Sequence, residues 1–343
     1  MLLYPDAGVD VLRNFRVGGS ERGLEKVNVT VLGPESFGGE FFRRSHAYIV
    51  ILWLVSVWAM ITNSSQAIFR LVFSKRQKKF SQILWEMGRD PKHISSVFVD
   101  RFNSINHEAK YGAAGWRSLK IFYNYHSYVR PKLKGIEGFM SRWWMEKMEN
   151  RQAVTNRYKI AVDLLEQAFR RFAQEKEIRL ISIASGSAQA VIEAMKRCPD
   201  LNIKAILIDV DKTAIEQSQK AAAEVGFSDR FKFIRGTTKQ LDKLCNKPHI
   251  IEMIGFLDYR PDDKAIALIK KIWECLALGG VFLTCNIRMN RERIFLSWTL
   301  LWPMIYRSEK QLARLLLAGG FEANKTELIY EPFRIHGIGL CLK

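Results

Sequence analysis

The sequence predicts an α/β fold over residues 150–343, with a mostly parallel sheet covered by helices on both faces and preceded by a helical N-terminal extension. From about residue 178, short apolar runs alternate with amphipathic segments of about 10 to 15 residues, which is typical of strand–helix repeats. Before residue 150 the apolar and aromatic residues recur with helical spacing instead. A hydrophobic content of 48%, with only 9 Pro and 22 Gly, excludes a disordered or collagenous chain.

The elements of residues 150–343 follow from periodicity. A helix is expected over residues 151–175, because Val154, Tyr158, Ala161, Leu165 and Phe169 recur on one helical face. The expected strands are residues 179–184, 203–209, 231–234, 249–254, 280–286, 327–330 and 335–342, and the expected helices are residues 188–197, 212–225, 263–277 and 309–318. The last two strands are expected to close the sheet.

Residues 1–149 divide into three segments. Residues 1–44 mix Gly, Pro and charge without sustained periodicity and are expected to be poorly ordered. Residues 45–79 are expected to form a hydrophobic helix with a basic flank, because the 25 residues between Arg44 and Arg70 include no Asp, Glu, Lys or Arg. Residues 80–149 are rich in aromatic and basic residues and predict a helical cap region, whose aromatic side chains either pack in its core or stack nucleic-acid bases.

The apolar run of residues 45–69 leaves two interpretations open, a membrane anchor and a buried or interfacial helix. A spanning helix needs about 20 mostly apolar residues, and this run reaches that length only by including the polar residues 62–66. Basic residues follow the run in greater number than they precede it: Arg70, Lys75, Arg76, Lys78 and Lys79 against Arg43 and Arg44. The positive-inside rule therefore places the C-terminal bulk in the cytoplasm, anchored to the cytoplasmic face of a membrane.

Charge and cysteine content limit the class of protein further. The formal net charge of +18 favours an anionic partner, such as acidic lipid, nucleic acid or an anionic substrate. The five Cys residues have no CxxC spacing and no Cys/His pairing, so no metal site is predicted. Their odd number and scattered positions also argue against a disulfide framework and favour a reducing compartment.

The first strand-to-helix turn of the predicted sheet is Ala184-Ser185-Gly186-Ser187-Ala188. Ligands of open α/β sheets bind beyond the carboxyl ends of the strands, and the helix N-terminus behind this turn presents free N–H groups. Asp209 ends the next strand 23 residues after Gly186, where an acid accepts hydrogen bonds from ribose hydroxyls. These residues predict a site for a ligand that contains a nucleoside.

The order and spacing of these segments resemble the class I S-adenosylmethionine-dependent methyltransferases, whose sheet is Rossmann-like. Five segments carry the resemblance: residues 181–188, 208–211, 233–237, 250–262 and 276–283. It covers about residues 150–343 and departs from the family pattern at four positions. Ser182 stands where an acid is usual, Ala184 and Ala188 replace glycines, and Thr237 stands where Asp is common. The alanines cost little provided that their backbone φ stays negative.

The resemblance implies a methyltransferase of the EC 2.1.1 class with S-adenosylmethionine as its cofactor. It implies that the cofactor-binding residues are Ala184, Ser185, Gly186, Asp209, Val210, Thr237 and Met253. A dinucleotide is the main rival ligand, but its pyrophosphate needs the GxGxxG spacing, which is absent here. S-adenosylmethionine has no phosphate and tolerates that absence.

The acceptor and the catalytic residues are less constrained by the pattern. The apolar run 294–306 implies a hydrophobic small-molecule or lipid-like acceptor, or else packs against the N-terminal helices. Three residues near strand ends are the catalytic candidates: His336 as a neutral base, Glu252 inside an apolar strand, and Tyr306. A buried structural His and a structural ion pair are the alternatives for His336 and Glu252. An RNA methyltransferase and a degenerate Rossmann-like domain that serves as a binding module are the alternative functions.

Overall fold

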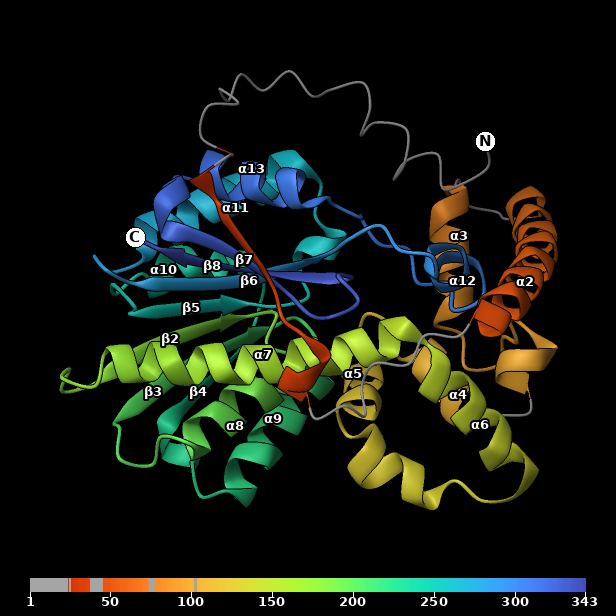
Figure 1. Cartoon of the computed structure of the whole chain (residues 1–343), viewed down its shortest axis with the longest axis horizontal. Coiled ribbons are helices and arrows are strands. Elements are labelled where there is room, and N and C mark those ends of the chain that lie inside the picture. The colour runs from red at the N-terminus through yellow and green to blue at the C-terminus, as the bar shows by residue number, and fades with distance from the viewer. Residues whose placement is uncertain (1–23, 25, 38–45, 74–77, 102–103) are drawn as a thin grey trace. The chain divides into compact units, whose positions relative to one another are not determined.

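The computed structural model describes residues 24, 26–37, 46–73, 78–101 and 104–343 (Figure 1). The chain divides into two compact units, each built from separate stretches of sequence. Unit 1 comprises residues 1–17, 38–155 and 289–304, and unit 2 comprises residues 18–37, 156–288 and 305–343.

Unit 2 contains a single eight-stranded sheet in the order β1-β7-β8-β6-β5-β2-β3-β4. Its strands are β1 (Asn28–Val31), β2 (Ile178–Ile183), β3 (Ile203–Asp209), β4 (Phe231–Arg235), β5 (Ile250–Met253), β6 (Val281–Ile287), β7 (Thr326–Tyr330) and β8 (His336–Leu342). Neighbouring strands are parallel except that β8 runs antiparallel to β6 and to β7. The predicted mostly parallel sheet is confirmed.

Helices lie between most consecutive strands of unit 2. They are α8 (Gln189–Lys196), α9 (Lys212–Glu224), α10 (Leu241–Leu244), α11 (Asp262–Cys275) and α13 (Glu309–Ala318), and α7 (Glu149–Arg171) precedes β2. Helix α11 packs with α10 and with α13, and α8 packs with α9 (Figure 1). Strand β3 and helix α13 begin and end at the residues that periodicity predicts, because their apolar patterns are regular up to both ends.

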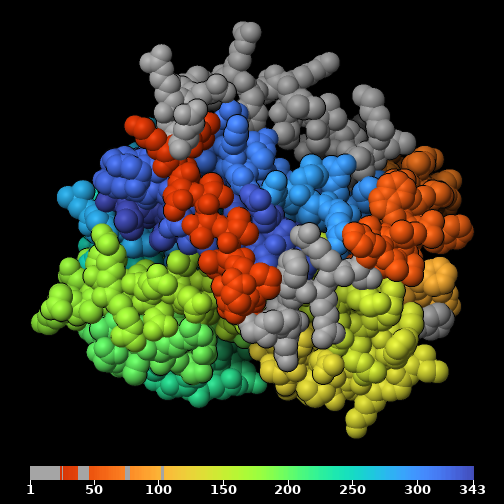
Figure 2. Space-filling view, viewed as in Figure 1, coloured from red at the N-terminus to blue at the C-terminus, as the bar shows by residue number. Residues whose placement is uncertain are grey.

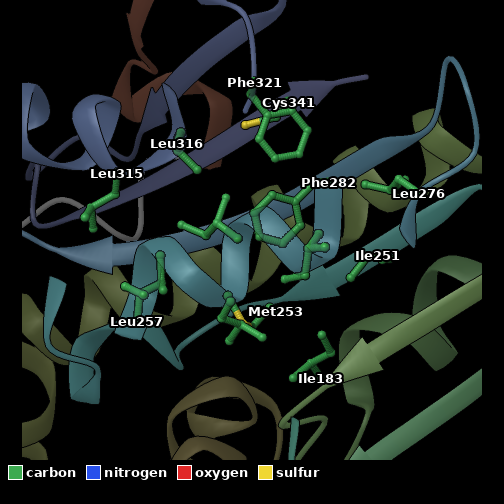
Figure 3. Packing of buried hydrophobic residues seen from close by; sticks show 14 of the residues in the cluster. Ile183, Ile251, Met253, Leu257, Leu276, Phe282, Leu315, Leu316, Phe321 and Cys341 are labelled. Atoms are coloured by element: carbon green, nitrogen blue, oxygen red, sulfur yellow. The ribbon is translucent and has the colours of Figure 1, made fainter. Parts of the chain in front are cut away.

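The core of unit 2 lies between the sheet and the helices α11 and α13 (Figure 3). Ile183, Ile251 and Phe282 come from β2, β5 and β6, and Leu316 and Phe321 come from α13 and the residues after it. Phe282 and Phe321 stack with their ring centroids 5.6 Å apart. Burying side chains of this size stabilises the fold by about 1.5–3 kcal/mol each, so this layer fixes the positions of the strand ends.

Strand β1 was not predicted from the sequence. It pairs in parallel with β7, and the side chains of Asn28 and Thr30 donate hydrogen bonds to Glu327 Oε1 at 3.2 and 2.7 Å. Figure 2 shows this segment in red, at the surface beside the C-terminal strands in blue. Four residues at a sheet edge, with Val29 and Val31 exposed, give no core pattern to detect. The remainder of the predicted poorly ordered segment, residues 1–23, 25 and 38–44, lies outside the described residues.

Cys245 and Cys275 form a disulfide, with their Cα atoms 5.0 Å apart. The expectation that the cysteines are unpaired is therefore wrong for this pair, and the argument for a reducing compartment loses its basis. Cys245 follows α10 and Cys275 ends α11, so the packing of these two helices brings together residues 30 positions apart. Cys198, Cys285 and Cys341 are free and buried.

Unit 1 is helical in the part that the structure describes. Its α-helices include α2 (His46–Val72), α3 (Phe80–Gly88), α4 (Ser104–Tyr111), α5 (Trp116–Tyr123), α6 (Gly135–Lys147) and α12 (Arg293–Trp298). Helix α2 is long and apolar enough to cross a membrane by length and composition, although 33% of its most apolar window is buried. It packs against α3 and α12.

The apolar run 294–306 forms α12 and an irregular segment after it. Trp298 and Leu301 are buried in a cluster with Ala67 of α2 and with Leu84 and Met87 of α3. This packing against N-terminal helices is the second of the two roles expected for the run, and it accounts for the apolar composition of residues 294–302.

Candidate active site

The order of the strands reverses between β2 and β5, because β3 and β4 lie on one side and β6, β8 and β7 on the other. In open α/β sheets the crevice beyond the carboxyl ends of the strands at such a switch point is the place for a ligand. The turn after β2 and the segments after β3, β4, β5 and β6 all meet this edge. Most of the predicted site residues lie in these segments.

The turn after β2 has three residues in the left-handed region. Ala184, Gly186 and Ala188 have φ values of 53°, 55° and 52°. The condition that Ala184 and Ala188 keep a negative φ is therefore not met. Each left-handed non-Gly residue costs about 1–2 kcal/mol of conformational free energy. Ala188 is the N-cap of α8 and makes no side-chain cap hydrogen bond. The turn thus keeps the backbone conformation of a glycine-rich turn, although Ala184 and Ala188 replace two of the glycines.

Asp209 joins this turn to the end of β3. Its Oδ2 accepts the Gly186 N–H at 2.8 Å and its Oδ1 accepts the Asp211 N–H at 2.9 Å. Each carboxylate oxygen keeps further acceptor capacity, because an ionised carboxylate offers about four lone-pair sites. Burial raises the pKa of Asp209, and the two backbone hydrogen bonds oppose that shift. The side chain is half-buried, so a ligand at the strand ends can reach it.

The other predicted cofactor residues divide between this edge and the core. Val210 follows Asp209 with its side chain 61% exposed, and Thr237 lies just beyond β4, where Gly236 N–H donates to the Asp209 carbonyl at 2.8 Å. The Ser185 hydroxyl oxygen is buried and has no hydrogen-bond partner among the described residues. Met253 has no exposed surface and packs in the core of Figure 3, so its side chain does not line this edge.

Glu252 lies directly opposite Ser182 in the pairing of β2 with β5. The Ser182 hydroxyl donates to Glu252 Oε2 at 2.5 Å, and the Ile254 N–H donates to Oε1 at 2.9 Å. Burial raises the pKa of Glu252 to about 7, and these hydrogen bonds oppose the shift. Ser182 occupies the position at which the family pattern has an acid, so the neighbouring strand supplies the carboxylate that this position lacks.

Three further segments, two of which contain the candidates His336 and Tyr306, meet at Ile287, the last residue of β6. His336 is its partner across the antiparallel pairing, and the Ile287 N–H donates to Asp258 Oδ1 at 2.7 Å. The Arg307 N–H donates to the Ile287 carbonyl at 2.9 Å, which places the adjacent residue Tyr306 at the same end of β6. The structure thus brings the backbones of His336, Asp258 and Tyr306 to one strand end.

The His336 side chain is 2% exposed, and neither ring nitrogen has a hydrogen-bond partner among the described residues. Burial lowers the pKa of His336 well below its usual value, and the positive charge of Arg157 lowers it further. The ring is therefore neutral at pH 7. A buried histidine normally has its ring nitrogens satisfied, so this ring offers a donor and an acceptor to a ligand.

Arg157 and Asn156 are buried polar residues that the sequence did not single out. The Arg157 guanidinium lies 3.7 Å from Cys285 Sγ. Burial raises the pKa of Asp258 and of Glu252, and the positive charge of Arg157 opposes both shifts. Asn156 is wholly buried, and its amide atoms have no hydrogen-bond partner among the described residues. Both belong to α7, whose first nine residues are all buried. Polar residues in a helical pattern predict a solvent face, so the sequence carried no signal for them.

The strand-end residues suit the nucleoside part of a ligand better than a phosphate. No group of three or more His, Cys, Asp or Glu side chains suited to a metal occurs among the described residues. The Gly186 N–H, which would face a pyrophosphate, is already bonded to Asp209. Two clefts, of about 580 and 240 Å³, are lined by residues of unit 1 and include none of the strand-end residues. The candidate site is therefore defined by the polar groups at the strand ends and not by either cleft.

One solved structure shares this fold, and two others align with the chain at TM-scores below 0.5. A structure described as a possible exported protein from Bordetella parapertussis aligns with a TM-score of 0.58 and 13% identity, covering 84% of this chain and 96% of that chain. An O-methyltransferase family protein from Burkholderia thailandensis aligns with a TM-score of 0.43 and 13% identity, covering 59% and 62%. Human N-acetylserotonin methyltransferase gives a TM-score of 0.41 and 14% identity, covering 69% and 67%. No curated protein matches the sequence.

One protein family does match the sequence. The family Methyltransf_20, described as "Putative methyltransferase", matches residues 118–341, which is more than half of the chain. Together with the sheet order and the turn after β2, this match confirms the predicted class I S-adenosylmethionine-dependent methyltransferase fold. The chain belongs to this methyltransferase family.

Proposed function

We propose that the protein transfers a methyl group from S-adenosylmethionine to a hydrophobic small-molecule or lipid-like acceptor, as an enzyme of the EC 2.1.1 class. The observation that carries the proposal is the Asp209 carboxylate, held at the end of β3 by the Gly186 and Asp211 amides beside the exposed Val210 side chain. A carboxylate next to an apolar surface, with no phosphate-binding turn, fits a ribose diol and an adenine ring.

The strand-end residues would hold the cofactor in a defined way. Asp209 would accept hydrogen bonds from the ribose hydroxyls, and Val210 and Thr237 would contact the adenine. Ala184, Ser185 and Gly186 would hold the rest of the cofactor, and the Ser185 hydroxyl, which has no hydrogen-bond partner among the described residues, could bond to it. The cofactor supplies a methyl group on a positively charged sulfur, so the protein mainly holds the acceptor in line with it.

The acceptor side of the site is buried and carries a neutral base. His336 is neutral at pH 7, so one ring nitrogen is free to take the proton of an acceptor hydroxyl. Tyr306 at the same end of β6 and Glu252, whose pKa is about 7, are the other candidates for proton transfer. Charged acceptors lose solvation in such a site, which favours an apolar acceptor with a single hydroxyl or amine.

Calorimetric titration of the full chain with S-adenosylmethionine and S-adenosylhomocysteine tests the cofactor site. We expect micromolar affinity, and a loss of at least tenfold in Asp209→Ala, with no binding of NAD. Asp229→Ala is the matched control, since Asp229 is exposed and ends no strand. Unchanged binding in Asp209→Ala would contradict this assignment of the site. No binding by a folded wild-type chain would favour the binding-module alternative.

A methyl-transfer assay separates the acceptor classes. The full chain is incubated with S-adenosylmethionine labelled on its methyl group and with apolar alcohols, phospholipid vesicles or RNA. We expect label in the apolar or lipid fraction, and a lower kcat with unchanged cofactor affinity in His336→Asn. Label in RNA would instead establish the RNA methyltransferase alternative. Wild-type turnover in His336→Asn at every pH would exclude a role for the ring in proton transfer.

We also propose that the protein works at the cytoplasmic face of a membrane. The support is the long apolar helix α2 and the basic residues that follow it, since the cytoplasmic leaflet of a membrane carries anionic lipid. Membrane fractionation of cells that express the full chain tests this location, and a wholly soluble protein would contradict it.

A further inference from the structure

Helix α2 has two faces with different surroundings. Seven of its side chains are buried, and they recur every three or four residues: Tyr48, Leu52, Val55, Ser56, Ala59, Asn63 and Ala67. The opposite stripe is exposed and also recurs at helical spacing: Val50, Leu54, Trp58, Ile61, Ile68 and Val72, each between 54% and 69% exposed. We call these six residues the outer stripe. Only Ser65 interrupts it, between Ile61 and Ile68.

The buried face is fixed to unit 1 by specific polar contacts. Asn63 has no exposed surface, and its Nδ2 donates to the Trp298 carbonyl at 2.8 Å and to the Ser95 carbonyl at 3.4 Å. Its Oδ1 lies 3.2 Å from His93 Nε2. A helix that crossed a bilayer with these contacts intact would carry the exposed carboxylate of Glu86 on α3 toward the hydrocarbon. The contacts therefore oppose a spanning orientation.

The Ser and Thr hydroxyl groups of α2 are satisfied within the helix. The side chains of Ser56, Thr62, Ser64 and Ser65 each donate to the carbonyl four residues earlier, at 2.5 to 3.1 Å. These polar groups need no water partner, so the outer stripe can leave water without an unpaired hydroxyl donor. Figure 2 shows α2 in orange at the surface.

The basic residues at and after the end of α2 indicate which kind of surface the outer stripe contacts. Residues 70–92 contain seven Lys or Arg and two acids, a net charge of +5. Arg70 lies 4.0 Å from Asp90, and Lys78 pairs with Glu86 at 2.7 Å, so the two acids are already compensated. The segment therefore keeps a net positive charge, which an anionic surface attracts at roughly fivefold in affinity per basic residue near that surface.

We propose that α2 lies in the plane of an anionic membrane surface, with the outer stripe among the acyl chains and the basic residues after it among the headgroups. This inference specifies how the protein meets the membrane proposed above, and it does not depend on methyl transfer. An amphipathic helix of this kind buries its apolar face at the boundary between headgroups and acyl chains. The bound lipid is anionic, because the flanking charge is positive.

Vesicle flotation of the full chain tests the surface. We expect binding to vesicles with 30% phosphatidylserine, at least tenfold weaker binding to phosphatidylcholine alone, and release by salt. The triple variant Leu54→Gln, Trp58→Gln, Ile61→Gln should lose at least tenfold in binding. The matched control is Ile136→Gln, Phe139→Gln, which changes two exposed apolar residues of α6. Equal binding by the triple variant and the wild type overturns the proposal, as does a stable dimer in solution that the triple variant dissociates.

The depth of the helix distinguishes lying in the plane from spanning. Single cysteines at Val50, Ile61 and Val72 are labelled with an environment-sensitive fluorophore, and quenching by spin-labelled lipids reports depth. We expect three equal, shallow depths. A label at Ile61 that lies deepest, with shallow labels at both ends, would show that α2 spans and would overturn the proposal. Wild-type chain treated with the fluorophore corrects for labelling of the native thiols. Cofactor affinity is measured in parallel, so failure of membrane binding is distinguishable from failure of the proposed function.

Discussion

At the scale of single residues, the turn after β2 keeps a glycine-type backbone with alanine side chains. Ala184 and Ala188 both lie in the left-handed region, at φ 53° and 52°. The turn must hold this conformation because the Gly186 amide faces Asp209 Oδ2 at 2.8 Å. Strain of this kind persists at functional sites when the surrounding structure determines the backbone.

Ala184→Gly is expected to stabilise the protein by about 1 kcal/mol, because it removes the cost of a left-handed Cβ at a half-buried position. Ala188→Gly is expected to be nearly neutral, since Ala188 is 4% exposed and the lost methyl burial of about 0.8 kcal/mol offsets the gain. Urea unfolding of both variants measures these changes. Destabilisation by Ala184→Gly would show that the turn is not strained at this position.

Glu252 makes the stability of the protein depend on pH. Its pKa is raised to about 7 by burial, so the neutral form is favoured in the folded protein. A raised carboxyl pKa means that stability is greatest below about pH 4.5 and is lost as pH rises to about 7, by roughly 1–3 kcal/mol. Glu252→Gln should remove this part of the slope. Urea unfolding between pH 4.5 and 8 measures it, and parallel curves for variant and wild type would contradict the assignment.

At the scale of elements, α2 and α12 are joined through one buried amide. Asn63 of α2 bonds the Trp298 carbonyl, and Trp298 packs with Ala67 and Leu301 in the same cluster. The apolar composition of residues 45–69 and of residues 294–306 is therefore explained in part by their packing, because each run buries one face against the other. What remains apolar and exposed on α2 is the outer stripe.

Asn63→Leu is expected to destabilise unit 1 by about 2–3 kcal/mol, since it leaves the buried Trp298 carbonyl without its donor. Gln66→Leu on the same helix is the matched control, because Gln66 is exposed, and it should change stability by less than about 0.5 kcal/mol. Thermal unfolding followed by tryptophan fluorescence compares the two. Equal effects would show that the Asn63 hydrogen bond does not stabilise the packing of α2.

The disulfide joins α10 to α11 and closes a loop of 30 residues. On the chain-entropy estimate, closing such a loop stabilises the folded state by about 3–4 kcal/mol. The double variant Cys245→Ser, Cys275→Ser should lose stability of this order, and reducing agent should destabilise the wild type but not the variant. If reducing agent leaves the wild type unchanged, the bond does not contribute to stability.

At the scale of the whole molecule, both compact units are discontinuous in sequence. Residues 18–37 supply an edge strand to the sheet of unit 2, and residues 289–304 belong to unit 1 although they lie between β6 and α13. A boundary drawn at residue 79 or 150 therefore removes β1 from the sheet. The net charge of +18 belongs to the chain as a whole, and residues 70–92 contribute +5 of it.

A fragment of residues 80–343 is expected to be less stable than the full chain and to self-associate. It lacks β1, so the edge of β7 that pairs with residues 28–31 becomes exposed. It also lacks α2, which uncovers the apolar cluster around Trp298. A chain that begins at residue 24 retains both elements and is the control. Sedimentation and urea unfolding of the two chains test this, and a monomeric 80–343 fragment of full stability would contradict it.

Periodicity and spacing in the sequence predicted strands β2 to β8 and helices α7, α8, α9, α11 and α13, the resemblance to methyltransferases and the carboxylate at Asp209, because these are local properties of the chain. Only the tertiary structure revealed β1, the disulfide and the buried Arg157, since each depends on partners distant in sequence. It also placed Met253 in the core and gave Glu252 its hydrogen bond from Ser182. Burial and strand register, which no sequence pattern specifies for a polar residue, decide which polar groups meet at a site.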